Sequence, residues 1–363
     1  MSRQFSGCPG AEVRPLAVTM GDPAGIGPEV IVRAVRELTL DGEEIPLIVV
    51  GHEATMKAAA AEVEGAPLPY AWQRGRPLVP LREGLAVFDV CGLTAKARFV
   101  PGHPSIEGAE AAYKCIVEAT RMVMANEASA LVTAPVSKQW ISSAGRHFVG
   151  HSELLAELSG TSIWRMMFAG DLLRVALVTV HIGLAQVPAA LSAEKVYDTI
   201  RLCADHLRVY FGIENPRIVV LGLNPHAGEN GLFGDEEQRI ISPAIERARS
   251  TGLDVLGPVA ADSAFARPQG RFEFDAAVAM YHDQGLLPVK TLEFDRAVNV
   301  TLGLPFVRTS PDHGTAFDIA GKGKANSSSM KAAIKYAWSA VSKKRRSDSA
   351  ARDLNSARFN ARS

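Results

Sequence analysis

Long apolar runs and closely spaced cysteines are both missing from this chain of 363 residues. No apolar segment approaches the roughly 18 residues that a membrane-spanning helix needs, so no membrane partner is expected. The four cysteines, at 8, 91, 115 and 203, form no CxxC pair, which excludes a zinc ribbon and a disulfide framework. Residues 1–14 lack the apolar core of a secretory signal. We therefore expect a cytoplasmic protein.

An excess of charge of either sign is also lacking, because 39 Lys and Arg residues balance 39 Asp and Glu residues. Such a chain has no overall field that would attract nucleic acid, and we expect no nucleic-acid partner. The length allows one large domain or two moderate domains with a substantial core.

Three motifs of common enzyme classes are absent as well. Without GxSxG a serine hydrolase is disfavoured, and without GxxxxGK[ST] so is a P-loop enzyme. A dinucleotide fingerprint begins at Gly25 and Gly27 but fails, because Val30 stands where the third glycine is needed. The loop 21–29 still offers backbone N–H groups at the start of a helix, which suits an anion; the alternative is a tight turn.

Short apolar segments alternate with segments of helical periodicity over most of the chain. This alternation predicts an α/β fold with mainly parallel sheets. Residues 66–104 are rich in proline and glycine and receive no assignment. Strands are predicted near 15–20, 46–51, 128–134, 174–181, 217–223 and 275–281, and helices near 30–38, 54–63, 107–126, 193–211 and 235–252.

Three histidines, His181, His226 and His282, each follow one of the predicted strands. The carboxyl ends of such strands form the edge of an α/β sheet where ligands bind. Imidazole is a preferred ligand of zinc, and three histidines with one open position are typical of a catalytic metal site. The alternative is that each histidine separately caps a strand or bonds to the backbone.

Further polar residues are concentrated after the same strands. The loop 224–235 carries His, Glu and Asn among closely spaced glycines, which favours a functional role. Asp283 follows His282 directly and can orient its imidazole, or it can cap a turn. Lys290, Asn299 and Arg308 stand in apolar segments that suggest strands, and a cation in an apolar strand needs an anionic partner. A ligand phosphate or carboxylate fits Arg308, and an ion pair within the fold is the alternative.

Six further motifs occur along the chain: GDPAGIGPE at 21–29, TAPVSK at 133–138, GHSE at 150–153, NPHAGE at 224–229, YHDQG at 281–285 and VNVTLGLPFVRTSPDHGTAFDIAG at 298–321. Together they resemble the 4-hydroxythreonine-4-phosphate dehydrogenase family of pyridoxal phosphate biosynthesis, over about residues 15–340. The family also has relatives that act on D-threonate or D-erythronate 4-phosphate and on a dihydrodiol dicarboxylate.

The resemblance implies a two-subdomain fold like that of isocitrate and isopropylmalate dehydrogenases, which binds its nicotinamide cofactor without the dinucleotide fingerprint. It also implies a homodimer whose active site is shared between the subunits. We expect one α/β subdomain at 15–140 plus 300–340 and a second, with the metal ligands and dimer contacts, at 141–299. Residues 1–14 are expected to be a disordered leader and 341–363 a basic tail.

The resemblance also implies roles for individual residues. The metal ligands are expected at His181, His226 and His282, and the substrate contacts at His151, Ser152, Lys290, Asn299 and Arg308. Ser152 stands where the family often has threonine, which keeps the hydroxyl. The cofactor is expected against Asp312, His313 and Gly314 and the loop 21–29. By context alone, Asp262 and Asp283 are the candidates for the general base.

The activity implied by the resemblance is oxidation of the C3 hydroxyl of 4-phosphooxy-L-threonine and decarboxylation to 3-amino-2-oxopropyl phosphate. It requires NAD or NADP and a divalent metal: zinc, magnesium or cobalt. One alternative is a dehydrogenase of D-threonate 4-phosphate, D-erythronate 4-phosphate or a related dihydrodiol acid. Another is a metal-dependent binding or regulatory protein that has lost turnover, which the motifs do not support because every mapped ligand is present.

Overall fold

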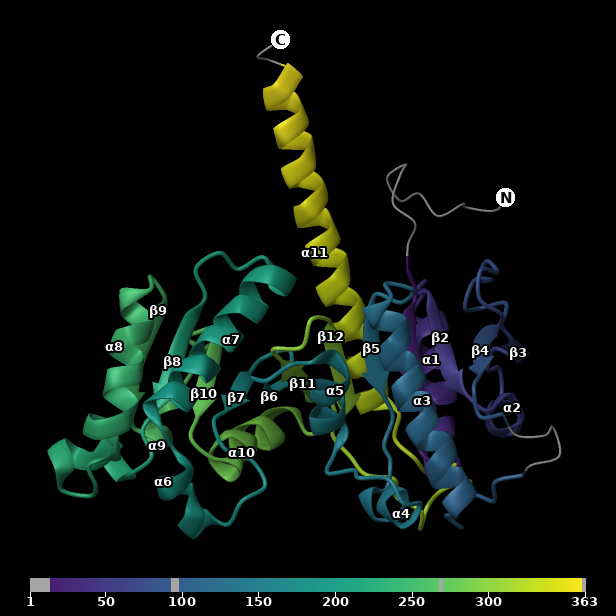
Figure 1. The fold of residues 1–363 in the computed structure, drawn as a ribbon, viewed down its shortest axis with the longest axis horizontal. Helices are drawn as coiled ribbons and strands as arrows, with labels where there is room; N and C mark the ends of the chain where they lie inside the picture. The colour runs from purple at the N-terminus through teal and green to yellow at the C-terminus, as the bar shows by residue number, and fades with distance from the viewer. Residues whose placement is uncertain (1–13, 93–97, 268–269, 361–363) are drawn as a thin grey trace. The chain divides into compact units, whose positions relative to one another are not determined.

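The computed structural model describes residues 14–92, 98–267 and 270–360. The chain forms two compact units, one of Met1–Ser159 with His313–Trp338 and one of Gly160–Asp312 with Ser339–Ser363. Each contains sheet strands and helices, which confirms the predicted α/β class (Figure 1). The sequence had placed the boundaries near residues 140 and 300. Of the predicted leader, only Arg14 lies among the described residues.

The sheet of the first unit is parallel throughout. Its strand order is β3 (Pro69–Ala71), β4 (Leu85–Asp89), β2 (Leu47–Gly51), β1 (Leu16–Thr19) and β5 (Ala130–Thr133). Every residue of β1, β2 and β5 is buried, as expected for strands covered on both faces. The helices are α1 (Gly27–Leu40), α2 (Glu53–Ala61), α3 (Ile106–Met124), α4 (Lys138–Ser143) and α5 (His151–Ser159).

The sheet of the second unit mixes two strand directions. Its order is β12 (Val307–Pro311), β11 (Val298–Leu302), β6 (Arg165–Ala169), β7 (Arg174–Leu177), β10 (Ala276–Ala279), β8 (Arg217–Leu221) and β9 (Asp254–Val259). The pairs from β12 to β7 are antiparallel and those from β7 to β9 are parallel. Over both units parallel pairs predominate, which confirms the mainly parallel sheets predicted from the sequence.

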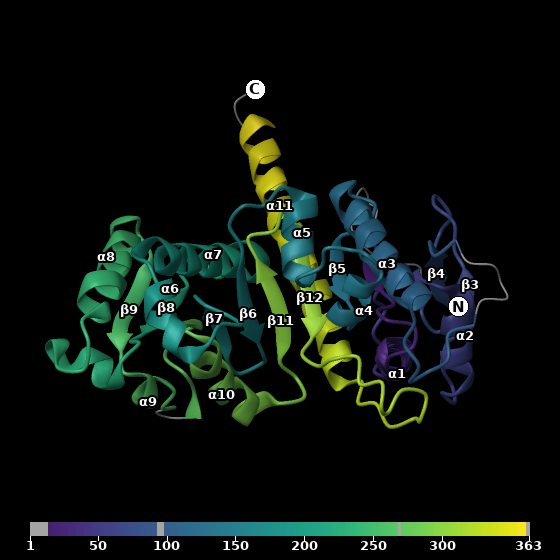
Figure 2. The same cartoon turned by 60° about the horizontal axis from the view of Figure 1, so that its bottom comes forward.

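Two long helices cover opposite faces of the second sheet (Figures 1 and 2). One is α7 (Ala193–Phe211), capped by the Ser192 hydroxyl at its start and ended by Gly212 in the left-handed conformation. The other is α10 (His282–Glu293). It packs so closely against the sheet that a Cβ at Gly285 would lie 2.5 Å from the Leu177 side chain. Shorter helical segments are α6 (Val187–Ala190), α8 (Ser242–Ser250), α9 (Ala261–Ala264) and a π-helical turn at Glu237–Ile241.

The C-terminal segment corrects one expectation. Residues 341–363 were predicted to form a solvated basic tail, whereas α11 (Ser328–Asn360) continues as helix to Asn360. The physical reason is that no proline or glycine follows Gly323, and the segment is rich in alanine, lysine and arginine, which favour helix. Among the described residues, none of the helices combines the length and the hydropathy that crossing a bilayer requires.

The three cysteines within the described residues, Cys91, Cys115 and Cys203, are free and buried. Burial raises the pKa of the Cys203 thiol to about 12. A hydrogen bond with Cys91, together with burial, raises the pKa of the Cys115 thiol well above its usual value. The Cys115 and Cys203 thiols therefore stay protonated at neutral pH and are poor nucleophiles.

Candidate active site

The three predicted metal ligands follow three adjacent parallel strands of the second unit. Strand β10 pairs with β7 on one side and with β8 on the other. His181 follows β7, His282 follows β10 and His226 follows β8, so all three leave the same edge of the sheet. This is the carboxyl-end edge that the sequence pattern predicted.

Two of these histidines lie side by side. The ring centroids of His181 and His282 are 5.8 Å apart. That spacing suits two imidazoles on one ion, because each nitrogen lies about 2 Å from a bound zinc. The Asp283 carboxylate contacts Nδ1 of His282 at 2.7 Å, which is the orienting contact expected from the sequence. It holds the proton on Nδ1 and leaves Nε2 free to act as a ligand.

The third histidine lies in the loop after β8, and its ring packs against Phe233 with centroids 6.1 Å apart. Within the described part of this single chain, no group of three His, Cys, Asp or Glu side chains is arranged to hold a metal. His181 and His282 thus fit a metal site, and a third ligand has to be added to them. His226 of the same chain after a loop movement, or His226 of a second copy, has the right chemistry.

Unusual backbone conformations mark the same loops. His181 has φ 49°, and the run from His226 to Asn230 has positive φ throughout. Left-handed conformation is unfavourable for residues other than glycine, and such residues cluster at functional sites. The His181 and His226 imidazoles therefore project from left-handed backbone, which the surrounding structure has to stabilise.

The predicted substrate residues of the second unit lie on α10, β11 and β12. Lys290 is on helix α10, not on a strand as its apolar context suggested, and its ammonium pairs with the Asp312 carboxylate. Arg308 on β12 is 3% exposed and donates a hydrogen bond to the Thr301 hydroxyl at 3.0 Å. Asn299 on β11 has a buried Oδ1 without a partner among the described residues.

The remaining predicted residues are divided between the units. In the first unit, His151 and the buried Ser152 open helix α5, and His313 and Gly314 follow the unit boundary. Asp262 is exposed on α9 of the second unit. Asp283 is also exposed, and its contact with His282 distinguishes it from Asp262.

The loop 21–29 of the first unit packs against the segment that follows His313. The amide of Ile26 donates to the Thr315 carbonyl at 2.9 Å. A Cβ at Gly25 would lie 2.9 Å from the same oxygen, so this position requires glycine. The two stretches predicted to contact the cofactor are therefore neighbours, and Gly314, beside Thr315, has open space where a Cβ would lie.

Sequence reasoning missed three buried polar side chains near these loops. Asp22 is 1% exposed and accepts a hydrogen bond from the Ala24 amide at 3.0 Å; burial raises the pKa of its carboxyl. Glu237 and Gln284 bind backbone groups beside the histidines. Asp22 and Gln284 belong to motifs already noted in the sequence, whereas Glu237 gave no signal.

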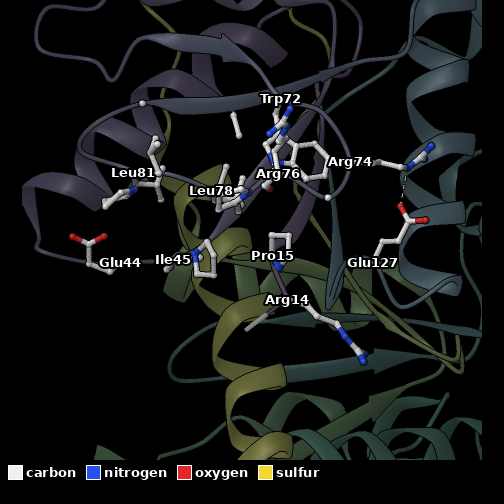
Figure 3. A pocket seen from close by; sticks show the side chains of 18 of the residues that line it. Arg14, Pro15, Glu44, Ile45, Trp72, Arg74, Arg76, Leu78, Leu81 and Glu127 are labelled. Atoms are coloured by element: carbon white, nitrogen blue, oxygen red, sulfur yellow. Dashed lines mark hydrogen bonds and ion pairs between the residues drawn. The ribbon is translucent and has the colours of Figure 1, made fainter. Parts of the chain in front are cut away.

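A cavity of about 800 Å³ lies elsewhere in the first unit (Figure 3). Residues from the beginnings of β1 and β2 line it, together with Trp72, Arg74 and Arg76 from the loop between β3 and β4. None of the predicted site residues, all of which are described, lines this cavity. It lies at the amino ends of the strands, away from the loops that carry the motifs.

Comparison with known proteins places the chain in one family. The family model "Pyridoxal phosphate biosynthetic protein PdxA" matches residues 43–337. The 4-hydroxythreonine-4-phosphate dehydrogenase of Geobacter metallireducens is 47% identical over 321 residues, 88% of this chain and 93% of that protein. The D-threonate 4-phosphate dehydrogenase of Salmonella typhimurium is 42% identical over 344 residues, 90% of this chain and 98% of that protein.

Solved structures agree with the sequence comparison. The 4-hydroxythreonine-4-phosphate dehydrogenase from Klebsiella pneumoniae matches with a TM-score of 0.81 and 40% identity, covering 90% of this chain and 99% of that one. A terephthalate 1,2-cis-dihydrodiol dehydrogenase from Burkholderia xenovorans matches with a TM-score of 0.65 and 29% identity, covering 90% and 98%. The chain belongs to the pyridoxal phosphate biosynthetic protein PdxA family, a family of dehydrogenases.

Proposed function

We propose that this protein oxidises 4-phosphooxy-L-threonine at its C3 hydroxyl, with NAD or NADP as acceptor, and that the product loses CO₂ to give 3-amino-2-oxopropyl phosphate. The observation that carries the proposal is the convergence of three histidine-bearing strand ends at one sheet edge, with His181 and His282 5.8 Å apart. The relatives named 4-hydroxythreonine-4-phosphate dehydrogenase support the choice of substrate.

His181, His226 and His282 would hold a divalent metal such as zinc, magnesium or cobalt. A metal at this position supplies a Lewis acid that lowers the pKa of the substrate hydroxyl. Asp283 keeps His282 in the required tautomer through its 2.7 Å contact with Nδ1. Both general-base candidates are exposed, and Asp283 is the better placed of the two because it contacts His282, whereas Asp262 lies on α9.

The substrate phosphate would be held by Lys290, Asn299 and Arg308, and His151 and Ser152 are further proposed substrate contacts. Arg308 is buried on a strand, so its guanidinium has a fixed position from which it can bind two phosphate oxygens. Lys290 pairs with Asp312 in the protein alone and would exchange this partner for the more highly charged phosphate. The buried Oδ1 of Asn299, which has no partner among the described residues, can accept a hydrogen bond from the substrate.

The nicotinamide cofactor, which accepts the hydride, would lie against the loop 21–29 and the segment 312–314. The absence of a Cβ at Gly314, where the space is open, lets a ligand approach the backbone closely, and Gly25 allows the loop 21–29 to pack against the same segment. We further propose a cytoplasmic homodimer whose active site takes residues from both subunits, because the described residues of one chain bring together only two of the three histidines.

A second candidate is a dehydrogenase of D-threonate 4-phosphate, since a relative of that name is 42% identical. Lys290 and Arg308 suit either phosphorylated acid and do not separate the two.

One assay tests both candidates. The zinc-loaded protein is mixed with NAD or NADP and with 4-phosphooxy-L-threonine, D-threonate 4-phosphate, D-erythronate 4-phosphate or a dihydrodiol dicarboxylate, and reduction of the cofactor and release of CO₂ are recorded. We expect the highest kcat/KM with 4-phosphooxy-L-threonine. A higher value with D-threonate 4-phosphate would select the second candidate, and no reduction with any compound would reject both in favour of a protein without turnover.

A further inference from the structure

Gln284 connects the segments that follow strands β10 and β8, just beyond the last paired residues of these two strands. Its side-chain Oε1 accepts a hydrogen bond from the Met280 amide at 2.7 Å. Its Nε2 donates to the Gly222 carbonyl, also at 2.7 Å. Met280 lies two residues before His282, and Gly222 lies four residues before His226. With only 9% of its surface exposed, Gln284 makes both bonds away from water.

The two bonds require an amide at this position. One partner is a backbone N–H and the other is a backbone carbonyl, so the side chain has to accept at one atom and donate at the other. A glutamate of the same shape keeps the acceptor but places a carboxylate oxygen against the Gly222 carbonyl. A leucine of similar size loses both bonds and leaves two buried backbone groups unpaired.

Neighbouring side chains extend the connection on both sides. The Glu237 carboxylate, 3% exposed, accepts hydrogen bonds from the Leu223 and Asn224 amides at 2.7 Å each. On the other side, the Thr179 hydroxyl donates to the Met280 carbonyl at 2.7 Å. Side chains thus link the starting points of all three histidine loops, and between the ends of β7 and β10 the Thr179 amide also donates to the Met280 carbonyl at 3.2 Å.

We propose that Gln284 is a positioning residue for the metal site: it fixes the segments that carry His226 and His282 to each other. The left-handed run at 226–230 has no ladder to hold it, so its geometry depends on where the loop begins. The role is the same whether the two imidazoles serve one metal or, in a site shared between subunits, two. The inference rests on the proposed metal site.

Zinc titration by calorimetry of metal-free wild-type protein and of the variants Gln284→Leu and Gln284→Glu tests the role. Loss of a residue that orients metal ligands typically weakens metal binding about 10- to 100-fold, and we expect a loss of this size in both variants. Gln139→Leu removes an exposed glutamine from α4 and is the matched control, with unchanged zinc affinity expected. Circular dichroism and Tm of the metal-free proteins establish that each variant is folded.

Folded variants that bind zinc as tightly as the wild type would overturn the inference, even with a lower Tm, because Gln284 would then be merely structural. If the leucine variant does not fold, the isosteric glutamate variant gives the same decision. Hydrogen exchange of the wild type needs no variant: zinc should slow exchange in 222–230 and 280–284 together, and protection of one segment alone would overturn the coupling. A wild type that binds no zinc would instead reject the metal site itself, a distinct outcome.

Discussion

The two units build their carboxyl-end loops by different means. In the first unit, the loop after β1 is shaped by backbone packing: glycines at 25 and 27 allow it to lie against the Thr315 and Met20 carbonyls. In the second unit, the loops after β7, β10 and β8 are held by the buried polar side chains Thr179, Gln284 and Glu237, and they present imidazoles. A glycine loop exposes backbone for close contact with a ligand, whereas fixed side chains suit ligands that need defined donor atoms. We therefore expect the proposed cofactor at the first surface and the proposed metal at the second.

The largest effect on activity is expected from the replacement of a proposed metal ligand in the second unit. His226→Ala should lower kcat by about 1,000-fold, equivalent to about 4 kcal/mol of transition-state stabilisation, because a metal ligand is lost. Zinc content by mass spectrometry should fall with it, while His147→Ala, at an exposed histidine, changes neither. Near-normal kcat with unchanged zinc content would remove His226 from the site.

Mixing two inactive variants tests whether the proposed metal ligands come from one subunit or from two. If His226 joins a metal held by the partner's histidines, hybrids of His226→Ala and His282→Ala subunits have one intact site, and the mixture should regain about a quarter of wild-type activity. His181→Ala mixed with His282→Ala should stay inactive, because those two ligands lie together in one chain. A mixture of the first pair that remains inactive despite proven subunit exchange would assign His226 and His282 to the same chain.

Arg308→Ala should raise KM for the phosphorylated substrate. A hydrogen bond to a charged group contributes roughly 1.5–3 kcal/mol, which corresponds to a loss of about 10- to 150-fold in kcat/KM. Arg308→Lys should recover only part, since a point charge cannot bind two oxygens in parallel. If instead the buried Arg308 mainly supports β11 through Thr301, Tm will fall and KM for the substrate will hardly change.

Gly314→Ala tests the backbone-built surface of the first unit. The added methyl group meets open space in the protein, so Tm should stay the same. If the cofactor lies there, its KM should rise roughly tenfold, equivalent to about 1.4 kcal/mol, while KM for the phosphorylated acid stays constant. Gly25→Ala should by contrast lower Tm, because its methyl group meets the Thr315 carbonyl. Unchanged cofactor KM in Gly314→Ala would move the cofactor away from this segment.

A separate effect concerns the acid stability of the second unit. Burial, with a contribution from Arg174, lowers the pKa of His206 on α7 from 6.5 to about 3. Below pH 6.5 the unfolded chain therefore binds a proton that the folded protein does not, so this group makes stability fall as pH drops from about 6.5 towards 3. The slope is at most about 1.4 kcal/mol per pH unit. His206→Gln should reduce the dependence of the free energy of unfolding on pH, measured by urea titration, whereas His147→Gln should not. Equal slopes in the wild type and in both variants would exclude His206 as the cause.

Local signals predicted some elements accurately. Helix α7 occupies the expected 193–211 because Ser192 caps its start and Gly212 ends it. Strands β3 and β4 were missed because they are short and lie in a segment rich in proline and glycine. They form because β4 pairs with β2 and β3 pairs with β4, and not because of a local sequence pattern. The C-terminal helix was missed because charged composition was taken as a sign of a solvated chain, while alanine and the absence of breakers favoured helix.

The location of the candidate site was predictable to the extent that it follows strand order. His181, His226 and His282 were singled out because each follows an apolar strand, and the adjacency of β7, β10 and β8 brings their loops to one edge. Their role as metal ligands stays a prediction. Glu237 was not predictable, since its partners are backbone amides 13 and 14 residues away, and such contacts leave no pattern in the sequence. Lys290 was assigned to a strand from its apolar neighbours, but in α10 those neighbours form the packed helix face.

The burial of the three described thiols has a practical consequence for labelling experiments. Cys91, Cys115 and Cys203 are shielded, and the raised pKa values of Cys115 and Cys203 leave almost no thiolate at neutral pH. Once Cys8 is replaced by serine, a single cysteine introduced at an exposed position should be the fastest group to react with a maleimide dye. Two such positions, one in each unit, would allow the distance between the units to be followed by fluorescence energy transfer while cofactor and substrate bind, without altering any interior residue.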